Sequence, residues 1–111
     1  MSFSVDRSPD FRADLKEQAG WYIEQGGFGL AERYLSAVSG TLARLARHPF
    51  SGRPRMFRAA GLSGLRSVVV ARPFDTHLVF YRVEGKTIEV VRVMHGARDL
   101  PRRLRQAPAA D

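Results

Sequence analysis

Cysteine is absent from this chain of 111 residues. Its absence excludes disulfides, zinc–thiolate sites and cysteine nucleophiles, and it suits a reducing compartment. The three histidines are scattered along the sequence and lack the spacing with acidic residues that metal ligands need. Neither a glycine-rich phosphate loop nor a serine-nucleophile motif is present. We therefore expect no metal and no cofactor.

Long apolar runs are also missing. No run approaches the ~18 residues that a membrane span requires, and residues 1–7 lack the basic lead and apolar stretch of a signal peptide. We expect a cytoplasmic protein with no membrane partner. The length fits one domain, residues 1–111, with enough apolar content (44%) for a core. Residues 106–111 are expected to form a frayed tail.

Lysine is scarce, because only two of the eighteen basic residues are lysine and the rest are arginine. Residues 1–49 hold six basic and six acidic side chains, so the whole net charge of +7 comes from residues 50–111. Arginine favours bidentate contact with phosphate or carboxylate. The second half therefore predicts an anionic partner, either a nucleic acid or an acidic protein. The alternative explanation for the preference for arginine is a codon bias, in which case the basic residues form a solvated face without a partner.

Helical periodicity dominates the first half. Ser8-Pro9-Asp10 is typical of a helix start, and Gly26-Gly27 is typical of a helix end. A second helix is predicted from Phe28 to His48, because Pro49 disfavours helical backbone at the residue before it. The short connection predicts an antiparallel helical hairpin.

Strand patterns fill most of the remainder. A short strand is predicted near residues 3–6, and longer ones over residues 65–71, 76–83 and 88–94. Residues 50–64 are predicted to be a loop, and Asp99-Leu100-Pro101 to start a short closing helix. Glu84-Gly85 is predicted as the hairpin turn, which would place His77 opposite Arg92. The order β-α-α-β-β-β indicates an α+β fold, with a mostly antiparallel sheet and the helical hairpin on one face.

The strands are apolar on both faces. Leu78 and Phe80 lie on one face of their strand, whereas Val79, Tyr81 and Val83 lie on the other. A helical hairpin can cover only one face of a sheet. The second face is therefore covered either by the loop and closing helix or by a partner protein.

Several segments, in order from about residue 5 to residue 104, resemble ParE and RelE toxins. The most specific is Ile88-Glu89-Val90-Val91-Arg92-Val93-Met94-His95-Gly96-Ala97-Arg98-Asp99, which resembles the ending of ParE toxins. The other matching segments are Ser8-Pro9-Asp10-Phe11-Arg12-Ala13-Asp14-Leu15, His48-Pro49-Phe50-Ser51-Gly52-Arg53-Pro54-Arg55, Leu65-Arg66 and Val79-Phe80-Tyr81-Arg82-Val83.

The resemblance implies the toxin of a type II toxin–antitoxin pair, neutralised by a ParD-like antitoxin whose disordered tail wraps around it. ParE-like members inhibit DNA gyrase, whereas RelE-like members cut messenger RNA on the ribosome. Our first interpretation is a non-catalytic gyrase inhibitor involved in plasmid stabilisation, which contacts DNA only through the antitoxin complex. The second is a ribosome-dependent endonuclease with His95, Arg66 and Arg82 at its site. The third is a toxin-fold protein that only binds its antitoxin.

The candidate residues for binding the target or the antitoxin are mostly arginines of the second half. They are Arg53, Arg55, Arg66, Arg92, Arg98 and, from the first helix, Trp21.

Overall fold

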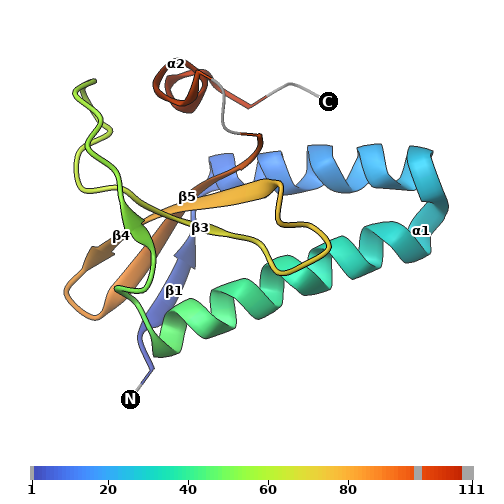
Figure 1. The fold of residues 1–111 in the computed structure, drawn as a ribbon, viewed down its shortest axis with the longest axis horizontal. Helices are drawn as coiled ribbons and strands as arrows, with labels where there is room; N and C mark the ends of the chain where they lie inside the picture. Colours follow the sequence, from blue (N-terminus) through green and yellow to red (C-terminus); the bar gives the residue numbers. More distant parts are fainter. Residues whose placement is uncertain (1, 97–98, 109–111) are drawn as a thin grey trace.

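The computed structural model describes residues 2–96 and 99–108, and it is drawn in Figure 1. In chain order its elements are β1 (Ser4–Arg7), α1 (Pro9–Arg47), β2 (Arg53–Pro54), β3 (Arg66–Val69), β4 (His77–Glu84), β5 (Thr87–His95) and α2 (Leu100–Arg105). The predicted α+β class and the predicted order are confirmed, apart from β2.

Helix α1 is a hairpin of two arms, residues 9–26 and 28–47, joined at Gly27. Gly27 has φ 83° and ψ 180°, a conformation that glycine adopts without steric cost. Figure 1 shows the two arms meeting at this tip on the right. The predicted N-cap is confirmed, since the Ser8 hydroxyl accepts a hydrogen bond from the Phe11 N–H at 3.0 Å. The second arm ends where Pro49 predicted, with His48 as its C-cap.

The sheet has the strand order β1-β5-β4-β3-β2. β1 runs parallel to β5, and the other three pairings are antiparallel. Strand β2 was not predicted, because residues 50–64 were expected to be loop throughout. It pairs only Arg53 with Ser67 and Pro54 with Arg66, so it is too short to leave a periodic pattern. Proline is tolerated there because β2 is an edge strand.

The hairpin between β4 and β5 turns one residue later than predicted. Glu84 pairs with Thr87, which makes Gly85-Lys86 the turn, and Gly85 has φ 60°. A register shift between Phe80 and Tyr81 moves the pairing by a further residue. His77 therefore lies opposite His95, and the predicted pairing of His77 with Arg92 is wrong.

Two apolar clusters lie on the two faces of the sheet. The first packs α1 against the sheet and includes Phe11, Tyr34, Val79, Tyr81 and Val90. The second holds Phe80 and Met94 together with residues of the loop before β3 and of α2, namely Leu62, Leu65, Leu100 and Leu104. The chain's own loop and closing helix thus cover the second face, which accounts for the strands that are apolar on both sides.

Candidate partner-binding site

A groove of about 1210 Å³ runs along the first arm of α1. Its lining combines apolar side chains with charged ones of both signs. The lining residues are Arg7, Phe11, Arg12, Leu15, Lys16, Glu17, Gln18, Ala19, Gly20, Trp21, Ile23, Glu24, Leu35 and His95. Apolar surface flanked by charge at an open groove is typical of a protein-interaction site.

Trp21 is the large aromatic side chain of this groove. Its side chain is 52% exposed, and its ring packs edge-on against Tyr22 with a centroid separation of 5.1 Å. About half of the Trp21 surface therefore remains accessible to a partner. Trp21 was a predicted binding residue, and its position in the groove is suitable for that role.

Arg53 and Arg55 project from the face of the sheet that α2 covers. Arg53 pairs with Ser67, and Ser67 pairs with Phe80 of the second apolar cluster. The Arg55 Nε donates to the Ser67 Oγ at 2.8 Å, and its guanidinium lies 5.9 Å from the Phe80 ring centre. Partial burial, and then the charge of Arg53, lower the pKa of Arg55.

Arg66 lies on the opposite face, because it pairs with Tyr81 of the first cluster. Its guanidinium donates to the carbonyl oxygens of Phe50 at 3.2 Å and Gly52 at 3.0 Å. The Tyr81 hydroxyl fastens the same loop, accepting from the Gly52 N–H and donating to the Pro49 carbonyl, both at 2.9 Å. Arg66 therefore holds the start of the loop in place through its Nη1 atom.

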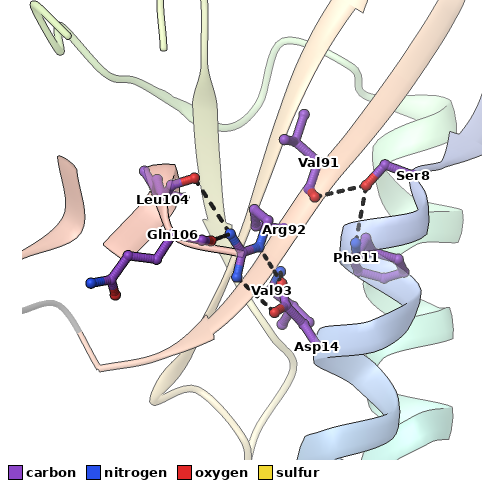
Figure 2. Close-up of polar contacts among 8 residues, drawn as sticks. All are labelled: Ser8, Phe11, Asp14, Val91, Arg92, Val93, Leu104 and Gln106. Atoms are coloured by element: carbon purple, nitrogen blue, oxygen red, sulfur yellow. Dashed lines mark hydrogen bonds and ion pairs between the residues drawn. The ribbon is translucent and has the colours of Figure 1, made fainter. Parts of the chain in front are cut away.

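Arg92 is buried, at 4% exposure, and not on the binding surface where it was expected. Figure 2 shows its guanidinium between α1 and the end of α2. It forms a bidentate ion pair with Asp14, at 2.7 and 2.9 Å, and donates to the Gln106 carbonyl at 2.6 Å. The expected frayed tail is thus tied down at its first residue. The candidate Arg98 and residues 109–111 lie outside the described residues.

A cluster of rings that the sequence did not predict surrounds His77. The Tyr22 hydroxyl and His77 Nε2 are hydrogen-bonded at 2.8 Å, and the His77 ring lies 4.9 Å from that of His95 and 4.7 Å from that of Tyr34. Burial, and then the charge of His95, lower the pKa of His77 to about 4. His77 is therefore a neutral, packed side chain near pH 7. No feature of the sequence indicates the cluster, because it depends on the register shift that brings the two histidines opposite each other.

The alternative nuclease residues do not come together. Arg66 and Arg82 lie on opposite faces, because Arg66 pairs with Tyr81 and Arg82 follows Tyr81 in β4. Arg82 donates to the carbonyls of Gly61 and Ser63 and pairs with Glu89. His95 pairs with His77, which lies four residues along β4 from Tyr81, roughly 13 Å at the usual rise per residue.

Neither a metal cluster nor a membrane helix is found in the part of the chain that the structure describes. Within residues 2–96 and 99–108, no group of three or more His, Asp or Glu side chains is placed to hold a metal ion. The helices of the same residues are all too short or too polar to cross a membrane.

A model of the ParE toxin family of type II parDE toxin–antitoxin systems matches residues 5–100. The chain belongs to the ParE toxin family. Two curated relatives, both named Toxin ParE1, come from Mycobacterium tuberculosis strains CDC 1551 / Oshkosh and ATCC 25618 / H37Rv. Each is 34% identical over 98 residues, which cover 87% of this chain and 93% of the relative.

Three solved structures have a fold similar to that of this chain. A chain of the chromosomal ParDE system from P. aeruginosa has a TM-score of 0.70 and 20% identity, covering 86% of this chain and 98% of that one. A chain of the RelBE2 toxin–antitoxin complex from Mycobacterium tuberculosis has a TM-score of 0.61 and 25% identity, covering 86% and 99%. A free-state mutant of E. coli RelE has a TM-score of 0.52 and 15% identity, covering 97% and 95%.

Proposed function

We propose that this ParE-family toxin acts by binding and inhibiting DNA gyrase, and that a ParD-like antitoxin neutralises it. The match of residues 5–100 to the ParE toxin family is the observation that carries the proposal, since gyrase is the target associated with the ParE branch. The toxin would act in the cytoplasm. Its effect would be plasmid stabilisation if the gene pair is carried on a plasmid.

The arrangement of Arg66, Arg82 and His95, the residues of the endonuclease interpretation, favours a toxin that acts by binding over one that acts by catalysis. Metal-free cleavage of RNA needs an acid, a base and phosphate-binding cations around one phosphate. Arg66 and Arg82 are on opposite faces of the sheet, and both guanidinium groups are engaged with loop carbonyls. His95 lies at a third position, against His77.

The antitoxin is expected to occupy the groove along the first arm of α1. A partner protein on the second face of the sheet was one of the two possibilities that the sequence left open, but the chain's own loop and α2 cover that face. The groove offers apolar surface beside charged side chains, with Trp21 exposed in it. A disordered segment that forms an amphipathic helix on binding suits such a groove, because it buries a large apolar area.

The test is a supercoiling assay with purified gyrase, run beside a cleavage assay on ribosome-bound messenger RNA. We expect the purified chain to inhibit supercoiling, and equimolar antitoxin from the neighbouring gene to restore it. The messenger should remain intact. Messenger cleavage without any effect on gyrase would reject the proposal in favour of the ribosome-dependent endonuclease, and inactivity in both assays would reject it in favour of a chain that only binds its antitoxin.

A further inference from the structure

Positive charge is concentrated on one side of the molecule, the side of the sheet opposite α1. We call this the basic face. It includes the second-face side chains of β2 and β4, the loop that packs on them, and α2. Its arginines are Arg53, Arg55, Arg58, Arg82, Arg102, Arg103 and Arg105, and its acidic residues include Asp6 of β1, which pairs with Glu89, together with Glu84, Glu89 and Asp99.

The placement of these arginines follows from strand register and packing. Arg53 pairs with Ser67 and so projects on the same side as Phe80. Arg58 is exposed between Phe57 and Ala59, which both pack against the second apolar cluster. Arg105 follows Leu104, the residue that anchors α2 in that cluster. Figure 1 shows α2 at the top and the loop on the left, both away from the tip of the α1 hairpin.

Several of these charges have no anion nearby. Arg82 is paired with Glu89 at 3.4 Å and Arg102 with Asp99 at 3.3 Å. Exposed Arg53, Arg58 and Arg105, in contrast, form no side-chain hydrogen bond or ion pair with any residue that the structure describes. Burial, and then the nearby charge of Arg53, lower the pKa of Arg55. Repulsion between neighbouring cations is the kind of interaction that a bound polyanion relieves.

We propose that the basic face binds duplex DNA directly, through its phosphates and without reading sequence. This interaction is additional to the proposed inhibition of gyrase, does not depend on it, and differs from our first expectation that DNA is contacted only through the antitoxin complex. Clustered arginines bind a regular array of phosphates by releasing counterions from the duplex. Helix α2 has only six residues, and among residues 2–96 and 99–108 no longer helix lies on this face to enter a groove of the duplex.

Duplex DNA is favoured over a single strand by the absence of a stacking platform. Proteins that bind single strands stack bases on exposed aromatic rings. On the basic face, Phe57 is half-buried and Phe80 fully buried in the second cluster. The exposed aromatic side chains of the described residues lie elsewhere: Trp21 and Phe28 on α1, and Phe50 beside Arg66 on the other side of the sheet.

The experiment measures binding of the full chain to a short labelled duplex by fluorescence anisotropy, over a series of salt concentrations. The test variant is Arg53→Gln/Arg58→Gln/Arg105→Gln. The matched control is Arg33→Gln/Arg44→Gln/Arg47→Gln, which removes three exposed arginines from the second arm of α1. Both variants lose the same net charge. A third variant, Arg53→Lys/Arg58→Lys/Arg105→Lys, keeps the charge on the basic face.

We expect the wild type to bind the duplex with a strong salt dependence. The test variant should bind at least tenfold more weakly, with a slope of log K against log salt that is shallower by about 3, since each phosphate contact contributes about 1. The control variant and the lysine variant should lose much less affinity for the duplex. Circular dichroism checks that every variant is folded, which the exposure of all the altered side chains predicts.

Three results would overturn the inference. They are no salt-dependent binding by the wild type, equal weakening of the test and control variants, and tighter binding of single-stranded DNA or RNA than of the duplex. Because no gyrase is present in the assay, these results are independent of the proposed function. Duplex binding through the basic face, together with no inhibition of gyrase, would reject the gyrase proposal and leave this inference standing.

Discussion

Asp14 and Arg92 form a buried ion pair that joins the first arm of α1 to β5. Both carboxylate oxygens accept from the guanidinium, at 2.7 and 2.9 Å, and one of them also accepts from the Val93 N–H at 3.1 Å. Arg92 further donates to the Gln106 carbonyl beyond α2 (Figure 2). One arginine thus connects the helical hairpin, the sheet and the C-terminal segment.

Replacing Asp14 with Asn should therefore lower the free energy of unfolding by about 3–5 kcal/mol, because it leaves the Arg92 charge buried and uncompensated. The control Asp10→Asn, at an exposed first-turn position, should cost less than about 1 kcal/mol. Urea denaturation monitored by circular dichroism measures both. Equal costs for the two variants would show that the buried pair contributes little.

Two buried tyrosines should respond in opposite ways to loss of the hydroxyl. Tyr81→Phe should cost about 1–3 kcal/mol of unfolding free energy, because the Gly52 N–H and Pro49 carbonyl lose their partner. The Tyr34 hydroxyl is buried and has no hydrogen-bond partner among the described residues, so Tyr34→Phe should be neutral or stabilising. The two urea midpoints test this together, and a Tyr34→Phe loss as large as that of Tyr81→Phe would contradict it.

Folding stability should decrease in acid through His77. Its pKa is about 4 in the folded chain, below the usual 6.5. The unfolded chain therefore binds the proton more readily between these values, and stability is lost as the pH falls from about 6.5 to about 4. In His77→Gln this contribution disappears, so the fall in the urea midpoint between pH 7.5 and pH 4.5 should be smaller than in the wild type. The same fall in both proteins would place the acid sensitivity at other groups.

Trp21→Ala should weaken antitoxin binding by roughly 30-fold, the usual effect of removing a central aromatic contact worth about 2 kcal/mol. Phe28→Ala is the matched control, because Phe28 is more exposed, at 72%, but lies outside the groove lining. Isothermal titration with the antitoxin of the neighbouring gene measures both. If Phe28→Ala had the larger effect, the antitoxin would have to bind at the hairpin tip instead of in the groove.

His95→Ala should leave growth arrest on induction largely intact, because the proposed toxin works by binding. A nuclease that lost its general acid or base would slow by about 10²–10⁴-fold. The readout is growth after induction, with messenger integrity followed in the same cells. A folded His95→Ala chain that no longer arrests growth, beside a wild type that cleaves messenger, would establish the endonuclease.

Local features of the fold were predictable from the sequence because neighbouring residues determine them. Ser8-Pro9 marked the start of α1, Gly27 the hairpin tip and Pro49 the end of the second arm, since capping and backbone preference act over a few residues. The apolar residues on both faces of the segment 78–83 predicted a strand that is covered on both sides, as the two apolar clusters show. The sequence alone also showed that the net positive charge lies in the second half of the chain. The segments that resemble ParE and RelE toxins, in the same order along the chain, also indicated the family. The match of residues 5–100 to the ParE toxin family shows it.

Features that depend on contacts between distant residues were decided only by the tertiary structure. The register shift at Phe80 and Tyr81 set His77 against His95, because pairing between strands is not fixed by either strand alone. In the sequence, nothing distinguishes Arg92 and Arg66 from the arginines that the structure leaves exposed. Yet Asp14 draws one into the core, and the carbonyls of Phe50 and Gly52 engage the other. Which arginines remain available to a partner is therefore a property of the folded chain, because burial and pairing act across the whole sheet.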